Sequence, residues 1–201
     1  MLLAHFAPDP KVEVDFDRYY VDVHLPERAG LAGFGPVHRF IAAERDADGR
    51  AALLTVYELE DARLLHAPAY VALGVDPYMA EVLAGSTRFY RVVAERTGDD
   101  LPDPGGRPPA AALMALPPSD APPPLTAVPG LVVTRHAYRT IESNIAMPPT
   151  FALHTVDADA DEQGDAAVAA LVGCLAGAPW GTFRAVPVIH THGSDPVGRA
   201  A

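Results

Sequence analysis

Apolar side chains in the first half of the chain recur with spacings that predict alternating strands and helices. Residues 1–6 form a short apolar run, which is typical of a buried strand. Residues 15–28 begin with Asp15, a favourable N-cap, and continue with aromatic and apolar side chains three or four positions apart. This spacing predicts an amphipathic helix. Most of its inward face comes from Phe16, Tyr19, Tyr20 and Val23.

Two β-type runs follow this helix and predict a hairpin. Residues 37–44 and 52–59 are rich in apolar side chains, and an Asp- and Gly-rich turn separates them. Helical segments are expected between Asp61 and Gly85, and residues 87–95 are typical of a closing strand. The resulting order, β-α-β-β-α-β, is that of the ferredoxin-like arrangement.

Prolines mark the middle of the chain. Ten of the 21 prolines fall within residues 98–130. Each proline removes a backbone donor and fixes φ, so no long helix or central strand is expected there. The second half repeats the element order, with a proline-rich stretch in place of its first helix. Its expected elements are strands at 110–116, 131–141, 150–156 and 182–191 and a helix at 161–176.

We therefore predict an α+β protein built from two ferredoxin-like units in tandem. The N-terminal unit spans residues 1–97, a proline-rich linker spans 98–109, and a degenerate C-terminal unit spans 110–201. The helices of one such unit cover only one face of its sheet, so the other face needs a partner. Two sheets of one chain can pack face to face, which predicts an intrachain dimeric α+β barrel. Such a pseudo-dimer could pair further into a homodimer.

Composition and charge narrow the classes of function. The formal net charge of -11 argues against binding to nucleic acid or to an anionic membrane surface, because both need basic patches. The one cysteine, Cys174, cannot form an internal disulfide, and its apolar helical neighbours indicate a core residue. The sequence shows no signal-peptide pattern and no apolar run long enough to cross a membrane. We expect a cytoplasmic protein that acts on a small molecule.

The stretch FDRYYVDVHLPERAGLAGF, residues 16–34, resembles the EthD-like family of the dimeric α+β barrel superfamily. In that family an aromatic residue on the first helix is followed by His-Leu-Pro, which here is His24-Leu25-Pro26 after Tyr19 or Tyr20. Three further segments are similar to the family, namely YELED (57–61), HAPAY (66–70) and TRFYRVVAE (87–95). The resemblance covers residues 1–97. A tyrosine replaces the family's usual tryptophan, and the second half has no such motif.

The resemblance implies a barrel with a pocket for a small hydrophobic compound. Relatives of this fold include isomerases, dehydratases, polyketide cyclases and cofactor-free monooxygenases that act on aromatic or lactone substrates. We therefore expect a cofactor-independent enzyme that acts on a small hydrophobic carbonyl or aromatic compound and uses a histidine as proton shuttle. A non-catalytic small-molecule-binding or structural barrel is one alternative. A haem- or metal-binding barrel is another.

His24 and Tyr20 are the candidate catalytic residues. An ordinary histidine pKa of about 6.5 suits proton abstraction beside a carbonyl. Tyr20 lies four residues earlier, so both side chains share one helix face. The alternative is that His24 only shapes the turn before Pro26 and that Tyr20 is a core residue.

Further side chains are candidates for lining the pocket. They are Tyr19, Arg39, Tyr57, His5, His66, Tyr70 and Tyr90. Strand alternation places His38 and Arg39 on opposite faces, so one of them must face an apolar interior unless the charged one is solvated. Tyr57 shares its face with Thr55. For His5, packing within its strand is the alternative.

Metal and nucleotide sites are not expected. His190 and His192 share one strand face, and His136 and His154 could approach them, but no nearby carboxylate or cysteine completes a ligand set. The glycines of GLAGFG at 30–35 have the wrong spacing for a nucleotide loop and follow no strand.

Overall fold

The computed structural model describes residues 1–97, 111–115, 132–144, 147, 149–157 and 182–185. The predicted linker at 98–109, the helix at 161–176, Cys174, His190 and His192 lie outside these residues. No helix within the described ranges is long and apolar enough to cross a membrane.

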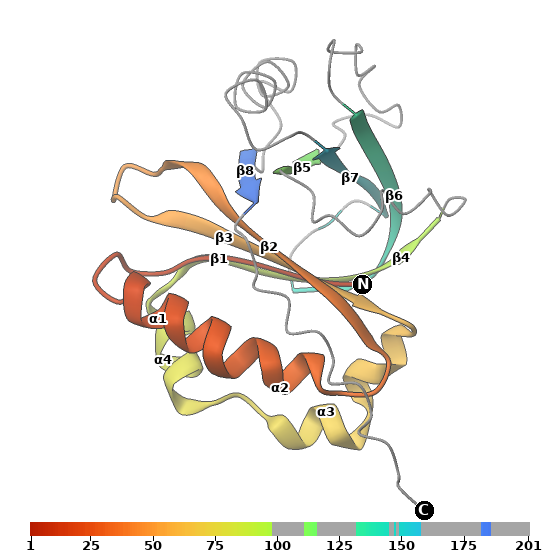
Figure 1. The fold of residues 1–201 in the computed structure, drawn as a ribbon, viewed down its shortest axis with the longest axis horizontal. Coiled ribbons are helices and arrows are strands. Elements are labelled where there is room, and N and C mark those ends of the chain that lie inside the picture. The colour runs from red at the N-terminus through yellow and green to blue at the C-terminus, as the bar shows by residue number, and fades with distance from the viewer. Residues whose placement is uncertain (98–110, 116–131, 145–146, 148, 158–181, 186–201) are drawn as a thin grey trace, which may run out of the picture.

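The first half follows the predicted order of elements (Figure 1). Its strands are β1 (Leu2–Ala7), β2 (Phe34–Arg45), β3 (Ala51–Leu59) and β4 (Thr87–Arg96). Its helices are α1 (Glu13–Tyr19), a π-helical turn (Tyr20–His24), α2 (Leu25–Ala29), a 3₁₀ turn (Ala62–His66), α3 (Pro68–Leu73) and α4 (Pro77–Gly85). The first helix begins before the predicted N-cap, so Asp15 lies in its first turn.

Aspartate side chains cap two later helical starts. The Asp61 carboxylate accepts a hydrogen bond from Arg63 N at the start of the 3₁₀ turn. The Asp76 carboxylate accepts from Tyr78 N and Met79 N at the start of α4. Pro68 occupies the first position of α3, where a proline is well tolerated.

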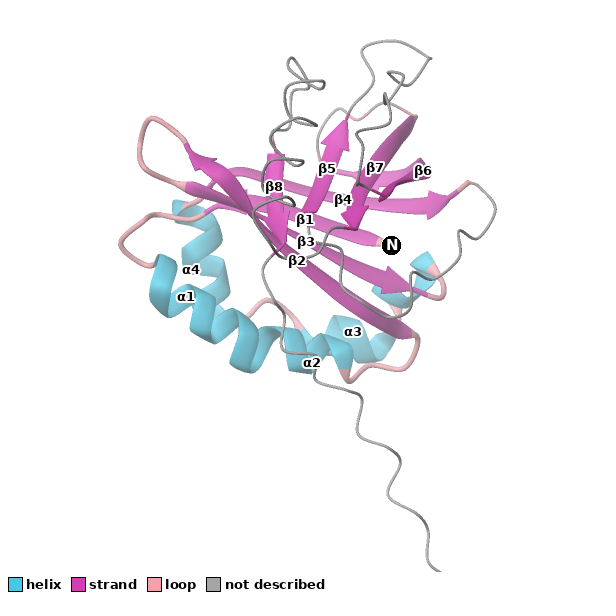
Figure 2. Ribbon diagram, turned by 45° about the horizontal axis from the view of Figure 1, so that its top comes forward, coloured by secondary structure: helices cyan, strands magenta, loops and turns pink. Residues whose placement is uncertain are grey.

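The strands of the first half pair antiparallel in the order β4-β1-β3-β2. From the second half, β6 (Val132–Ser143) pairs with β4, and β8 (Thr182–Ala185) pairs with β2. Between them lie β5 (Ala111–Ala115) and β7 (Thr150–Asp157), so the eight strands form a ring of antiparallel pairs (Figure 2). The predicted α+β class is confirmed. All the labelled helices lie against the outer face of the β1–β4 sheet (Figure 1).

Both faces of this sheet are buried, and each carries its own apolar cluster. On the helix side Leu2 and Leu53 pack with Phe16 from α1. On the other side Leu3 and Leu54, both 0% exposed, belong to a cluster that reaches β6 and β7. Adjacent strand residues point to opposite faces. The two clusters therefore explain why β3 is buried at every position from Ala51 to Tyr57.

Gly33, in the turn between α2 and β2, lies close to the side chain of Leu64 in the 3₁₀ turn, and a substitution can test this contact. Its φ is +83°, and a Cβ at this position would lie 2.6 Å from Leu64 Cδ1. We expect Gly33→Ala to lower the free energy of unfolding by about 2 kcal/mol, because backbone strain and the clash add together. Gly49→Ala is the matched control, with φ +75° and open space around its Cβ. It should cost only about 1 kcal/mol. Equal costs in urea unfolding would show that Leu64 does not constrain the turn.

Candidate functional site

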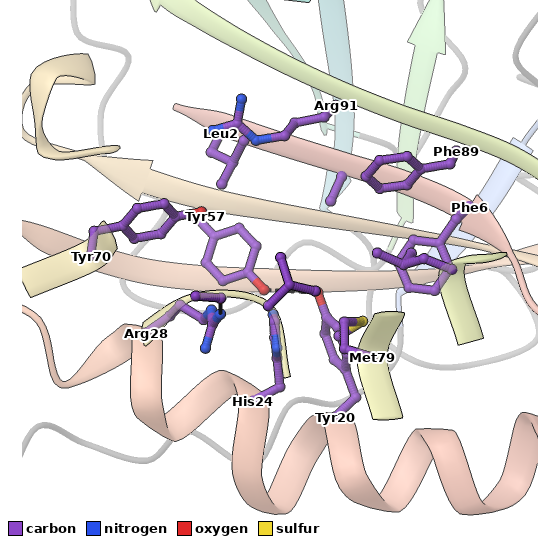
Figure 3. A pocket seen from close by; sticks show the side chains of 14 residues that line it. Leu2, Phe6, Tyr20, His24, Arg28, Tyr57, Tyr70, Met79, Phe89 and Arg91 are labelled. Carbon is purple, nitrogen blue, oxygen red and sulfur yellow. Dashed lines mark hydrogen bonds between the residues drawn. The ribbon is translucent and has the colours of Figure 1, made fainter. Parts of the chain in front are cut away.

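A cavity of about 150 Å³ lies between the helices and the β1–β4 sheet. Its apolar walls come from both layers (Figure 3). They include Leu2, Phe6, Met79, Leu83 and Phe89. The polar side chains that face it come mainly from one stretch of helix, where Tyr20, His24 and Arg28 follow each other at intervals of four residues. Tyr57 from β3, Tyr70 from α3 and Arg91 from β4 complete this group.

The helix changes its geometry at the site. Residues Tyr20–His24 form a π-helical turn between α1 and α2, and such turns occur frequently at functional sites. Phe16 anchors the helix one turn earlier, with its ring 5.4 Å from that of Phe6 and 5.3 Å from that of Tyr20. The imidazole of His24 stacks on the ring of Tyr20, with 4.6 Å between centroids. The structure thus brings the two candidate catalytic residues together.

The Tyr20 hydroxyl belongs to a buried polar chain. Tyr20 donates to Thr55 Oγ1 over 3.2 Å, and its oxygen lies 2.7 Å from the hydroxyl of Tyr57, which can donate to it. Burial raises the pKa of both tyrosines. Both phenols therefore stay protonated at neutral pH, and they hold the ring of Tyr20 in a fixed position beneath His24.

Arg39 supports the same ring from the sheet. Its side chain is 1% exposed, and its Nη2 lies 2.5 Å from Asp17 Oδ1 on α1. Its guanidinium carbon lies 5.2 Å from the centre of the Tyr20 ring, which is within range for a cation–π contact. The alternative of a solvated Arg39 is therefore wrong. His38, the neighbouring strand residue, points to the opposite face of the sheet. Its Nε2 lies 3.3 Å from Glu58 Oε1.

His24 has an unusual environment for a histidine. Burial, followed by the positive charge of Arg28, lowers its pKa to about 3, although Asp76 opposes the effect. The ordinary pKa expected from the sequence is therefore wrong for the folded protein, and His24 is neutral at pH 7. Within the described part of the chain, its Nδ1 is buried and has no hydrogen-bond partner. The imidazole itself lines the cavity, so the part of the ring that faces this space is available to a bound molecule.

Arg28 is a site residue that the sequence analysis missed. It is 8% exposed, and it donates to Glu27 Oε2 over 3.0 Å and to the carbonyl of Gly74 over 3.2 Å. The signal was available, because Arg28 continues the four-residue spacing of Tyr20 and His24 on one helix face. Arg91 on β4 also faces the cavity, and its Nη1 lies 3.0 Å from Glu142 Oε1.

No protein-family model, no curated protein and no solved structure matches this chain. The geometry of the site is thus the main basis for assigning a function.

The remaining predicted site residues divide between the cavity and other places. Tyr70 lines the cavity and stacks on Phe34, with 5.7 Å between ring centroids. Tyr19 lies beside Tyr78 instead, and burial together with the charge of Asp76 raises its pKa to about 12.

Three more candidates lie away from the cavity walls. His5 stacks on Tyr90, with 5.2 Å between their ring centroids. Strand alternation places His5 with Leu3, on the sheet face that points away from the helices. The side chain of His66 is 72% exposed, and its Nε2 lies 3.7 Å from Glu142.

Metal ligands do not gather in the described part of the chain. There, no three His, Cys, Asp or Glu side chains lie close enough together to hold an ion. The side chains of His136 and His154, which the sequence placed on neighbouring strands, lie outside the described detail.

Proposed function

We propose that this protein is a cofactor-independent enzyme that acts on a small hydrophobic carbonyl or aromatic compound. The compound would bind between the helices and the sheet, and His24 would transfer a proton. The reaction would be of the isomerase, cyclase, dehydratase or monooxygenase type. The observation that carries the proposal is the stacked His24–Tyr20 pair on the wall of a largely apolar cavity.

The resemblance to the EthD-like family supports this proposal. Its motif, residues 16–34, is the segment that supplies Tyr20, His24 and Arg28 to the cavity. The strand order of residues 1–97 is consistent with a ferredoxin-like unit. We propose that residues 110–201 form a second, degenerate unit and that the two halves make an intrachain dimeric α+β barrel.

The size and chemistry of the cavity limit the substrate. An apolar cavity of about 150 Å³ accommodates roughly one aromatic ring. The neutral imidazole of His24 is the form that accepts a proton. A pKa of about 3 makes it a weak base in the free protein. Burial is the larger cause of this low pKa and the charge of Arg28 the smaller one. An oxyanion that develops beside Arg28 would offset the smaller cause, so basicity would rise in part as the reaction proceeds.

Exchange of benzylic protons tests the proposed proton transfer. Phenylpyruvate and its neutral analogue phenylacetone are incubated with the protein in D₂O, and NMR follows loss of the C–H signal beside the carbonyl. We expect the protein to accelerate exchange for at least one compound. His24→Gln should reduce that acceleration by about a hundredfold, as expected for loss of a general base. His66→Gln is the control, because its side chain is 72% exposed and lies outside the cavity. Undiminished exchange in His24→Gln would rule out His24 as the base.

A non-catalytic binding protein is the second candidate. The low pKa of His24 favours it, because a group that stays neutral over a wide pH range is suited to a fixed hydrogen bond. Saturable binding of these compounds with no acceleration of exchange would select this function.

A further inference from the structure

The charge of the cavity is opposite to that of the protein. The chain carries a formal net charge of -11. Of the residues that the structure describes, fourteen line the cavity, and among them are two arginines and no aspartate or glutamate. The chain has 26 acidic and 15 basic residues, yet the charged side chains that line this space within the described part of the chain are both arginines.

Arg28 is the more buried of the two cations, and its orientation is fixed. Glu27 and the Gly74 carbonyl accept from its two terminal nitrogens, at 3.0 Å and 3.2 Å. A guanidinium has five N–H donors, so these two contacts leave capacity for a further acceptor. The side chain of Glu27 is 46% exposed whereas that of Arg28 is 10% exposed. Water therefore screens the carboxylate more than the guanidinium. The charge of Arg28 accordingly lowers the pKa of His24 more than the charge of Asp76 raises it.

Arg91 approaches from the sheet side, while Arg28 and His24 rise from the helix side (Figure 3). Arg91 is 29% exposed and its partner Glu142 is 49% exposed. This position near the solvent suits attraction of an anion, while the buried Arg28 suits its fixation. The apolar walls lie between the two cations, and Phe89 contributes a partly exposed ring.

We infer that the cavity selects a single-ring aromatic carboxylate or α-keto acid, with the carboxylate held by Arg28 and the ring against the apolar walls. This inference rests on the proposed function, since it names the substrate class of the same site. The planar fork of a guanidinium matches a carboxylate, which it can bind through two parallel hydrogen bonds. The bound anion would also lie near His24 and counter the charge of Arg28, so one contact would serve both binding and proton transfer.

Benzoate and benzamide form a matched pair of probes, because they have nearly the same shape and differ in charge. Calorimetric titration of the full chain should give at least about tenfold tighter binding for benzoate, as expected for one charge-assisted contact in a buried site. Arg28→Gln should abolish this preference. Arg28→Lys should keep part of it, since the charge remains but the fork is lost. Arg63→Gln is the control, because that side chain is 90% exposed and pairs with Asp61 away from the cavity.

Equal binding of benzoate and benzamide by the unmodified protein, or binding of neither, would overturn the inference. Unchanged preference in Arg28→Gln would also overturn it. If Arg28→Gln does not fold, NMR of the unmodified protein provides the decision. The chemical shift of the Arg28 Nε–H should change when benzoate is added and stay constant when benzamide is added. An unchanged shift with benzoate, or an equal change with both compounds, refutes the assignment.

The proton-exchange experiment keeps this inference separate from the proposed function. Selective benzoate binding through Arg28 without any benzylic exchange would retain the anion site and refute catalysis by His24. The opposite result is accelerated exchange of the benzylic protons of phenylacetone together with equal binding of benzoate and benzamide. It would support catalysis and refute the anion site.

Discussion

Acidification from pH 7 to pH 4 should lower the free energy of unfolding by about 3 kcal/mol through His24 alone. The pKa of His24 is about 3 in the folded protein, against an ordinary value of about 6.5 in an unfolded chain. The unfolded chain therefore takes up a proton first as the pH falls. The stabilisation is complete above about pH 6.5, and each further pH unit down to about pH 3 costs about 1.4 kcal/mol.

Urea unfolding at several pH values would measure this loss. The difference between the unmodified protein and His24→Gln isolates the contribution of His24, because other groups titrate in both. His24→Gln should lose about 3 kcal/mol less than the unmodified protein over this range. His66→Gln is the matched control for replacing a histidine, because its side chain is 72% exposed. Parallel pH profiles for His24→Gln and the unmodified protein would mean that His24 is protonated normally in the folded state.

Replacing Asp17 with asparagine should destabilise the protein by about 3 kcal/mol, because it would leave the charge of Arg39 buried without its counter-ion. The side chain of Arg39 is 1% exposed, whereas that of Asp17 is 49% exposed. Replacing Arg39 with methionine should cost only about 1 kcal/mol, since water can solvate the remaining carboxylate. The two partners of one ion pair should thus give unequal effects.

A double-mutant cycle tests this asymmetry. The variant that carries both Asp17→Asn and Arg39→Met should be more stable than Asp17→Asn alone, because no buried charge remains. Asp22→Asn on the neighbouring turn is an exposed control and should change stability by less than about 0.5 kcal/mol. An Asp17→Asn variant no less stable than Arg39→Met would contradict the account of Arg39 as a buried charge.

Local patterns predicted much of the first half of the fold. Apolar spacing located the helix that contains Phe16 and Tyr20, although it could not show the π-helical turn within it. Alternation in β3 placed Thr55 and Tyr57 on one face, and both meet Tyr20 there. The apolar spacing and the strand alternation each depend on residues close together in the sequence, which is why the sequence alone reveals them. The contacts with Tyr20 join distant segments and required the structure.

The electrostatic features of the site depend on contacts between distant segments. Strand alternation required either His38 or Arg39 to face an apolar interior. Arg39 takes that position because Asp17, on the distant helix α1, supplies its counter-ion. In the sequence, Arg28 is an ordinary charged residue near a helix end. Its role in the site follows from the hydrogen bond that it donates to the carbonyl of the distant Gly74. The pKa of His24 follows from burial by the whole helix–sheet layer. No pattern within one element contains that information.

Because β3 is packed on both faces, the site and the opposite side of the sheet share one backbone. Val56 lies between Thr55 and Tyr57 and belongs to the cluster on the far face. A larger side chain at Val56 would shift the strand and carry the two hydroxyls with it. Replacements in the two layers are therefore coupled through the strand, and a change on the far face can move the hydroxyls of Thr55 and Tyr57 relative to Tyr20.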